Sequence, residues 1–370
     1  MVHILTHPYL GNFGGGLQAY ALQQTVTKLG FESNIIEYIP SHIQKAYFRS
    51  LFRNIYELSK ACAKLVLNKD VHNTPCIRFA TVKHFKKHFL KLNNTSNVKP
   101  DDSFIVGSDQ VWRAVYARML GGVPKYFLDF ATPKQRQRSF AYAASFGTDE
   151  WEGSSEETEE CIQLIRDFKS VSVRETSGIQ LCKDIFSRDA TRMPDPTMLL
   201  QASEYSNLIN SSRTRLPKQP YIAKYILDET PDIRYIIEKT AKSQKLFVQN
   251  LLPNGKAKKI ADRFPISIPQ WLRYIRDAEY VVTDSFHGCV FCIIFNKPFV
   301  CIGNESRGNS RFATLMNTFD LQKRLISAPT TKKLEHLIST NIDWENVNAT
   351  LKSEQKKGIN YILTNLSQHE

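Results

Sequence analysis

Residues 280–288 of this chain read Y-V-V-T-D-S-F-H-G. A short β-branched and apolar run ends in three polar side chains, Asp284, Ser285 and His287, and Gly288 then opens a second apolar segment. Parallel α/β folds bind ligands at the carboxyl ends of their strands, and a histidine there changes its charge near neutral pH. The alternative is structural: Asp284 or Ser285 caps the next helix, and His287 is only hydrogen-bonded in place.

Strand-like and helical segments alternate on both sides of this stretch. The first unit runs from an apolar strand at Val2–Thr6 through a glycine loop at 11–16 and a helix ending at Gly30 to a strand at Asn34–Tyr38. This β-α-β opening predicts a parallel sheet with a right-handed crossover. A second alternation begins at Tyr221, after a polar segment.

At 370 residues the chain exceeds the usual size of a single core. We therefore expect two Rossmann-like α/β domains whose parallel sheets face a cleft. The expected boundaries are residues 1–205, with a basic helical insertion at 41–92, and residues 218–330. A helical tail, 331–370, is expected to pack back on the N-terminal domain.

The net charge of +13 is the main oddity of composition. A positively charged protein is attracted to nucleic acid, to an anionic membrane or to phosphorylated substrates. The run 83–91, K-H-F-K-K-H-F-L-K, interleaves aromatic and basic residues, but Phe85, Phe89 and Leu92 recur at helical spacing. That spacing favours an amphipathic helix with a solvated basic face. Since no nucleic-acid motif is present, we expect phosphates or a membrane surface as partners, and no nucleic acid.

The cysteines and the apolar runs argue against a metal site and against a membrane-spanning segment. Cys289 and Cys292 have C-x-x-C spacing without a second pair, and their apolar neighbours predict core residues instead of metal ligands. The longest apolar run, 288–302, is interrupted and too short to span a bilayer. We expect a cytoplasmic, metal-independent protein, with peripheral contact at the inner face of the cytoplasmic membrane.

Polar residues follow several of the expected strands and should meet at one edge of each sheet. The glycine loop has G-x-x-G-G-G spacing, which is not the dinucleotide fingerprint, yet glycines before a helix let an anion approach the helix N-terminus. The inventory contains one His, several carboxylates and at least three Arg, and Arg suits phosphate and carboxylate. A small, multiply charged anionic substrate is therefore expected.

Five motifs occur in order: G-N-F-G-G-G-L-Q-A-Y-A-L-Q from Gly11, V-G-S-D-Q-V-W from Val106, S-V-R-E from Ser172, T-D-S-F-H-G from Thr283, and Arg311-Phe. Together they resemble the polysaccharide pyruvyltransferase family over most of the chain. The resemblance implies a fold like that of the GT-B glycosyltransferases. It also implies transfer of a pyruvyl group from phosphoenolpyruvate, a co-substrate, to a sugar as a ketal, with no cofactor.

The resemblance also assigns roles. His287 is expected to contact the donor as acid or phosphate ligand, and Asp284 to orient it or act as base. The residues expected to bind phosphoenolpyruvate are Arg174, Lys224, Ser285, His287, Arg307 and Arg311. The residues expected to face the acceptor are Asn12, Gly14, Gly15, Asp109 and Gln110. Some relatives carry a basic residue where this chain has Ser285 and Phe286, so Lys224 or Arg307 is expected to replace it.

Structural roles remain open for some of these residues: Arg174 pairs with Glu175 or caps a helix, and Asp109 is an N-cap. Two other functions also remain open, a GT-B-type glycosyltransferase using a nucleotide sugar and a non-catalytic basic adaptor. The expected acceptor is a hexose such as galactose, including one linked to a polyprenyl diphosphate carrier in bacterial capsule or exopolysaccharide synthesis. The sequence specifies neither the oligomeric state nor the ketal stereochemistry.

Overall fold

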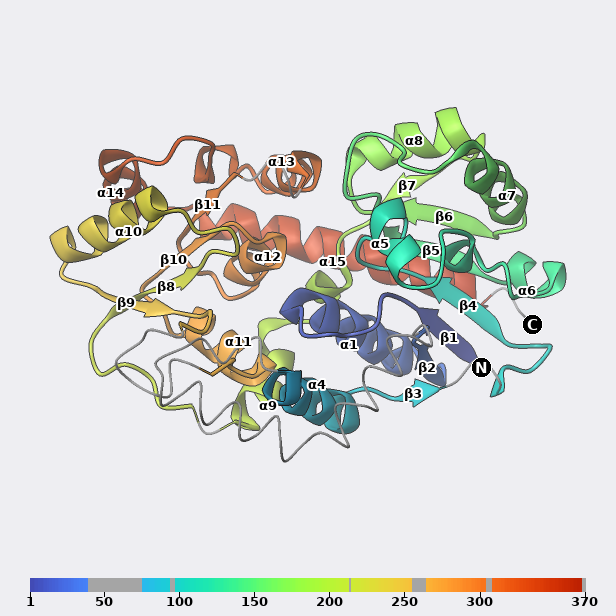
Figure 1. Ribbon diagram of the computed structural model, residues 1–370, viewed down its shortest axis with the longest axis horizontal. Helices are drawn as coiled ribbons and strands as arrows, with labels where there is room; N and C mark the ends of the chain where they lie inside the picture. The colour runs from blue at the N-terminus through green and yellow to red at the C-terminus, as the bar shows by residue number, and fades with distance from the viewer. Residues whose placement is uncertain (39–74, 94–96, 213, 255–263, 304–307, 368–370) are drawn as a thin grey trace.

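The computed structural model describes residues 1–38, 75–93, 97–212, 214–254, 264–303 and 308–367 (Figure 1). The strands within them form two sheets whose neighbouring strands pair in parallel. This confirms the predicted architecture of two α/β domains with parallel sheets. Arg307 and residues 39–74 of the expected insertion lie outside the described ranges.

The N-terminal sheet has seven strands in the order β3-β2-β1-β4-β5-β6-β7. Its strands are β1 Val2–Leu5, β2 Ser33–Ile36, β3 Leu92–Asn93, β4 Ser103–Val106, β5 Phe140–Ala144, β6 Ser170–Val173 and β7 Thr191–Arg192. The α-helices of this half are α1 Phe13–Lys28, α4 Pro75–Phe89, α5 Ala114–Met119, α6 Pro133–Gln137, α7 Ser155–Arg166, α8 Thr176–Phe186 and α9 Ser206–Asn210. Short 3₁₀ turns are η2 Pro124–Phe127, η3 Pro196–Leu199 and η4 Ala202–Tyr205.

The C-terminal sheet has five strands in the order β12-β11-β10-β8-β9. Its strands are β8 Tyr221–Tyr225, β9 Phe247–Asn250, β10 Tyr280–Thr283, β11 Phe299–Ile302 and β12 Leu325–Ile326. Its helices are α10 Pro231–Ser243, α11 Ile268–Arg276, α12 Phe286–Ile294, α13 Asn309–Thr318, η7 Gln322–Arg324 and α14 Thr331–Ser339, and α15 Trp344–Ser367 ends the described chain. Among the described helices, none is both long and apolar enough to cross a bilayer.

Two helices begin earlier than the sequence pattern predicted. Helix α1 starts at Phe13, because the side chain of Asn12 accepts a hydrogen bond from the Gly14 N–H (3.2 Å) and caps the helix. The three glycines expected in a loop therefore form its first turn. Helix α12 starts at Phe286, not at Gly288, so His287 also lies in a first turn. Because of these two differences, Gly14 and His287 each lie in the first turn of a helix.

Helix α4 and its surroundings correct another local prediction. Phe85 is buried against Tyr9, with ring centroids 5.4 Å apart, as its helical spacing predicted. Leu92, however, lies beyond the helix in β3 and is 41% exposed, because pairing of β3 with β2 takes the chain out of the helix. The apolar face of the helix thus ends at Phe89.

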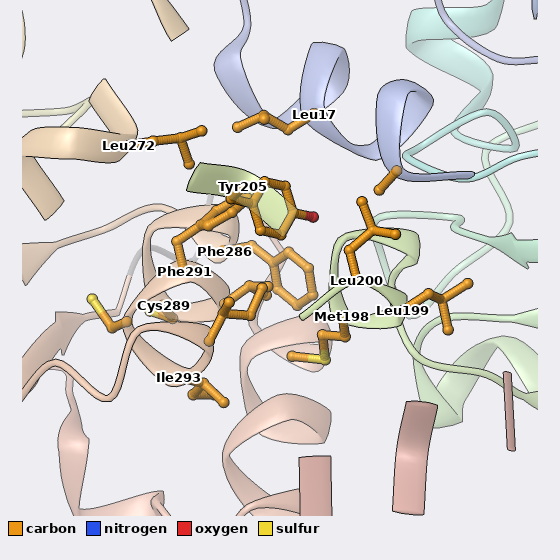
Figure 2. Close-up of a cluster of buried hydrophobic side chains, with 14 of the residues drawn as sticks. Leu17, Met198, Leu199, Leu200, Tyr205, Leu272, Phe286, Cys289, Phe291 and Ile293 are labelled. Carbon is orange, nitrogen blue, oxygen red and sulfur yellow. The ribbon is translucent and has the colours of Figure 1, made fainter. Parts of the chain in front are cut away.

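A shared core joins the two domains (Figure 2). Tyr205, at the expected end of the N-terminal domain, is fully buried, and its ring meets Phe291 of α12 edge-on at 5.0 Å. Leu17 of α1 and Leu272 of α11 belong to the same cluster. Cys289 is fully buried there too, in agreement with its predicted core role. Burial of this apolar surface holds the helix N-termini of the two halves together.

The last helix, α15, runs along both domains in Figure 1. On the N-terminal side, the Tyr361 hydroxyl donates to the Ala141 carbonyl (3.2 Å) and the Lys169 ammonium donates to the Asn365 carbonyl (2.6 Å). Gly358 lies against Tyr142 and Leu199, so that no side chain fits between the helix and the sheet. The tail is therefore packed on the N-terminal domain by specific contacts.

Candidate active site

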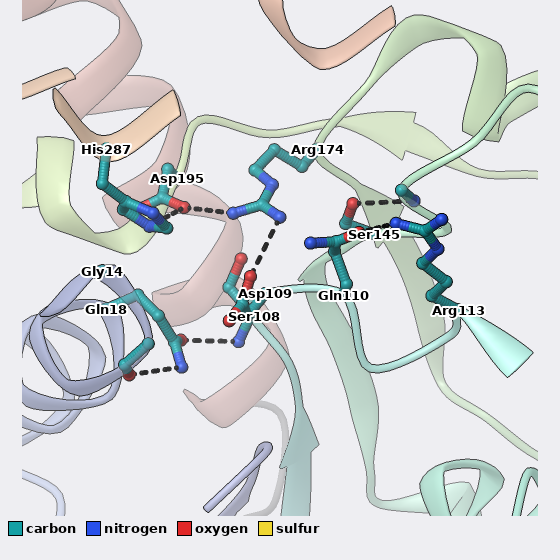
Figure 3. Close-up of polar contacts among 12 residues, drawn as sticks. Gly14, Gln18, Ser108, Asp109, Gln110, Arg113, Ser145, Arg174, Asp195 and His287 are labelled. Atoms are coloured by element: carbon teal, nitrogen blue, oxygen red, sulfur yellow. Dashed lines mark hydrogen bonds and ion pairs between the residues drawn. The ribbon is translucent and has the colours of Figure 1, made fainter. Parts of the chain in front are cut away.

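His287 lies where the two domains meet (Figure 3). Its ring is only 6% exposed and packs directly on Gly14 in the first turn of α1, so that a Cβ built on Gly14 would lie 2.6 Å from Cε1 of the imidazole. On its other side, Nε2 lies 3.4 Å from Oδ2 of Asp195. The first turn of α12, which carries His287, therefore lies against the first turn of α1, and the imidazole packs between them.

Asp195 connects His287 to Arg174. Its side chain is fully buried, and Oδ2 accepts a hydrogen bond of 2.7 Å from Nη1 of Arg174. Its Oδ1 accepts from the N–H (3.0 Å) and the hydroxyl (2.6 Å) of Thr197. Burial alone would raise the pKa of this carboxyl, but His287, Arg174 and Thr197 outweigh that effect and hold the pKa well below its ordinary value. Asp195 is thus an anion that lies beside both the Arg174 guanidinium and the His287 imidazole.

Sequence reasoning missed Asp195, since residues 193–197 read as a turn-rich stop. One signal was available: a carboxylate between two prolines, three residues after Arg192 at the end of β7. Strand β7 is the outermost strand of its sheet, and only the folded chain brings its carboxyl end to the second domain.

Arg174 follows β6, and its guanidinium is 2% exposed. Besides Asp195 it contacts Asp109, with 3.4 Å between Nη2 and Oδ1, and it lies over the Phe286 ring at 4.8 Å from the centroid. It forms no ion pair with Glu175, one of the alternatives left open by the sequence. Oε1 of Glu175 instead accepts hydrogen bonds from the backbone of residues 146 and 147 (2.7 and 3.2 Å). Glu175 thereby orders the loop after β5 and leaves Arg174 facing the cluster.

Asp109 is a third residue of the N-terminal domain in this cluster, beside Arg174 and Asp195. It follows β4 and caps no helix, because α5 begins at Ala114 with Arg113 as its N-cap. Burial would raise the pKa of Asp109, but Arg174 first, and then His287 and nearby cations, hold it below its ordinary value. The carboxylate is therefore ionised at neutral pH.

The loop that carries Asp109 is fixed to the glycine helix. The side-chain amide of Gln18 in α1 donates to the Gly15 carbonyl (3.1 Å) and the Thr6 hydroxyl (2.8 Å), while its oxygen accepts from the Ser108 N–H (3.0 Å). These contacts, several of which are drawn in Figure 3, link β1, α1 and the β4 loop. A Cβ on Gly15 would come within 3.4 Å of Asp109, so the backbone of α1 lies close to both polar groups.

Arg311 of α13 adds a second buried guanidinium. It is 6% exposed and lies 5.8 Å from the centroid of the Phe286 ring, the same ring over which Arg174 lies. Burial, and after it the positive charge of Arg174, lowers the pKa of Arg311 to about 10. Two like charges concentrated in a buried region favour a bound anion, which would lower their mutual repulsion.

The remaining expected residues take other positions. Lys224 is buried in an ion pair with Glu229. The Asp284 carboxylate accepts hydrogen bonds from the N–H groups of Leu227 (2.7 Å) and Asp228 (2.9 Å). Ser285 caps α12, and Gln110 accepts a hydrogen bond from Arg113 (3.2 Å). Within the described ranges, no group of three or more His, Cys, Asp or Glu side chains is arranged to hold a metal ion.

The fold and this site define a two-domain α/β protein of the GT-B type. The chain belongs to the polysaccharide pyruvyl transferase family, whose model matches residues 12–306. Comparison with curated proteins gave no match.

Among solved structures, UDP-N-acetylglucosamine 2-epimerase from Rickettsia bellii is similar at 9% identity, covering 100% of this chain and 98% of the other, with a TM-score of 0.50. S. aureus MnaA in its co-structure with UDP has 10% identity over 99% and 96% of the two chains and a TM-score of 0.48. A glycosyltransferase from Rickettsia africae has 8% identity over 100% and 99%, with a TM-score of 0.43. At 9% identity, the similarity to the epimerase shows the fold alone.

Proposed function

We propose that this protein transfers a pyruvyl group from phosphoenolpyruvate to a hexose, forming a ketal on two hydroxyls. The observation that carries the proposal is the buried set Arg174–Asp195–His287, with Arg311 beside the same Phe286 ring as Arg174. Phosphoenolpyruvate carries a carboxylate and a phosphate joined to one reactive carbon. Two guanidinium groups and an imidazole near one another match these two anionic groups.

The reaction requires a proton at carbon 3 of the enol, which makes carbon 2 electrophilic. One sugar hydroxyl adds to carbon 2, and the second displaces phosphate, so that both hydroxyl protons are lost. One of them balances the proton delivered to carbon 3, and the other leaves with the phosphate. In this scheme His287 supplies the proton or stabilises the departing phosphate, while Arg174 and Arg311 hold the donor.

Asp195, not Asp284, is the carboxylate that we assign to His287. Its Oδ2 lies 3.4 Å from Nε2, whereas Asp284 is bound to two backbone N–H groups of the loop after β8. Asp195 is therefore the carboxylate that can orient the imidazole. Asp109, ionised and across Arg174 from Asp195, is our candidate for the group that receives a hydroxyl proton.

We further propose that the acceptor is carried on a lipid diphosphate at the cytoplasmic membrane. The exposed side of α4 carries Lys83 and Lys87, and the chain as a whole has a charge of +13. Such a surface is attracted to anionic headgroups. Co-sedimentation with vesicles tests this part: equal binding to neutral and to anionic vesicles would refute it.

The main experiment measures phosphate release from phosphoenolpyruvate in the presence of simple and lipid-linked galactosides. His287→Gln should lower kcat and Arg311→Gln should raise the KM for phosphoenolpyruvate. Exposed residues provide matched controls, His336→Gln and Arg166→Gln, and both should behave as wild type. Turnover of a nucleotide sugar, with no acceptor-dependent phosphate release, would refute the proposal and favour a glycosyltransferase.

A further inference from the structure

A lysine lies on the face of the C-terminal sheet that packs against α10. Side chains two positions apart in a strand share a face, and Ile222 and Ile226, on either side of Lys224, are both buried in the apolar core that contains Ile237 of α10. Lys224 is itself only 6% exposed. Because lysine is almost never buried unless it is paired, its place beside this core calls for a specific explanation.

A hollow of about 380 Å³ adjoins this lysine. Its walls come from the ends of β8 and β9, from the N-terminal half of α10 and from the segment after β9. Asn250 at the end of β9 is the register partner of Lys224, so the two side chains lie next to each other on one face. Open parallel sheets bind ligands outside the carboxyl ends of their strands, and the volume lies within the range of small-molecule sites. The hollow therefore has the position and the size of a ligand site.

The charges that line the hollow cancel. The Lys224 ammonium donates to Oε1 of Glu229, and Nε of Arg234 donates to Oε2 of the same carboxylate (2.8 Å). Glu238, one turn further along α10, is exposed and forms no ion pair with another described residue. Two cations thus stand against two carboxylates, one of which is unpaired. Such a lining favours neither a free anion nor a metal ion.

Several polar groups of the lining are open to a ligand. The exposed fraction of the side chain is 7% for Lys224, 17% for Glu229 and 57% for Arg234. Oδ1 of Asn250 accepts a hydrogen bond from the Leu252 N–H (3.4 Å), but its NH₂ group forms none with the described residues. Carboxylate, ammonium, guanidinium and amide groups together offer both donors and acceptors. An uncharged molecule with several hydroxyl groups is the ligand that uses both.

The hollow is connected to the active site by one loop. Asp284, three residues before His287, accepts hydrogen bonds from the N–H groups of Leu227 and Asp228, and Glu229 is the next residue of that loop. Strands β9, β8 and β10 are consecutive in the sheet, and neighbouring strands lie about 4.8 Å apart. The ends of β9 and β10 are therefore about 10 Å apart at one edge, a distance that a short oligosaccharide spans.

We propose that this hollow is a second sugar subsite, which binds an uncharged residue of a glycan while another residue of the same glycan lies in the active site. The inference rests on the proposed function in that the glycan is the pyruvyl acceptor. It adds that the acceptor is an oligosaccharide and that the C-terminal domain takes part in recognising it. Lys224, which the sequence assigned to phosphoenolpyruvate, then serves the acceptor, because Glu229 offsets its charge and leaves N–H groups for hydroxyl oxygens.

The test uses the full chain with Glu238→Gln and Asn250→Ala. Glu238→Gln keeps the size of the side chain and removes its charge, and Asn250→Ala removes the amide. The matched controls are Glu345→Gln and Asn348→Ala, because both residues are exposed on α15. The probes are methyl β-galactoside, galactobiose and galactotriose, observed by saturation-transfer NMR and supplied as acceptors in the phosphate-release assay.

Wild type should bind the two oligosaccharides more tightly than methyl β-galactoside. Each site variant should weaken oligosaccharide binding, and raise the KM for the oligosaccharide, by about tenfold, which corresponds to the loss of one hydrogen bond. The KM values for methyl β-galactoside and phosphoenolpyruvate should not change.

Thermal unfolding distinguishes recognition from a structural role. Glu238→Gln should unfold at the wild-type temperature, because the Glu238 side chain is exposed and has no ion pair among the described residues. Asn250→Ala also loses the contact with Leu252, so Glu238→Gln is the decisive variant. A purely structural role would lower the unfolding temperature and affect all acceptors alike, which would overturn the subsite.

The outcomes separate the inference from the proposed function. Wild-type affinity of Glu238→Gln for both oligosaccharides overturns the subsite, even if phosphoenolpyruvate is turned over. Wild-type protein that binds the oligosaccharides no more tightly than methyl β-galactoside, or not at all, also overturns it. Oligosaccharide binding that depends on Glu238 and Asn250, without any use of phosphoenolpyruvate, would support the subsite and refute pyruvyl transfer.

Discussion

Gly14→Ala should inactivate the site without unfolding the protein. The built Cβ lies 2.6 Å from Cε1 of His287 and nearer still to Nδ1 and Cγ. Carbon atoms in contact stay about 3.5 Å apart, so the imidazole must move by about 1 Å. The ring has little freedom to do so, since it is buried and Asp195 lies on its other side.

The expected size of the effect follows from this displacement. A shift of 1 Å in a catalytic group costs roughly 10²-fold in rate, so kcat for phosphate release from phosphoenolpyruvate should fall about 100-fold. Stability should not fall in parallel, because Ala is favoured over Gly in a helix by about 1 kcal/mol. The neighbouring change Gly15→Ala is the matched control, since its Cβ meets nothing nearer than 3.4 Å.

Phosphate release and urea denaturation, measured on wild type and both variants, decide the matter. Gly15→Ala should lose far less kcat than Gly14→Ala, because its Cβ is only in van der Waals contact with Asp109, and both variants should unfold near the wild-type midpoint. Wild-type kcat in Gly14→Ala would show that the imidazole is not held where the structure places it. Equal loss of activity in the two variants would attribute the effect to the helix in general.

Three further predictions concern the same framework. Asp195→Asn leaves the buried Arg174 without its closest anion, and breaking a buried pair costs about 3 kcal/mol, so the urea midpoint should fall markedly; an unchanged midpoint would contradict the pairing. The folded pKa of His7 is about 4 against 6.5 when unfolded, so the unfolded chain holds more protons between these values. Stability due to His7 is therefore present above pH 6.5 and lost as the pH falls toward 4, by up to about 3 kcal/mol. Urea denaturation of wild type and His7→Phe at pH 7 and 5 measures this, and an equal pH dependence in both would refute it. Gly358→Leu should destabilise the docking of α15, because even a Cβ there would lie 2.6 Å from Leu199; limited proteolysis should then release the tail, with the half-exposed Leu363→Ala as the resistant control.

Much of the architecture could be predicted because it follows from local patterns. Runs such as Tyr280–Thr283 and Phe299–Ile302 are apolar, β-branched and bounded by polar residues, and both are strands with those same bounds. Their alternation with helical segments requires a parallel sheet. The starts of α1 and α12 were misplaced because the capping side chains of Asn12 and Ser285 add a turn that apolar periodicity does not reveal.

The sequence by itself determined the two α/β domains and the set of motifs that places the chain in its family. Which side chains pair with one another in the site was decided by the tertiary structure. Asp284 is three residues from His287 in the chain, yet its carboxylate is bound to the loop after β8, whereas Asp195, 92 positions earlier, lies beside the imidazole. His7 likewise gains its surroundings only when β1 pairs with β4. Periodicity and capping depend on neighbours in the chain, but burial, charge pairing and unsatisfied polar atoms depend on which elements pack together.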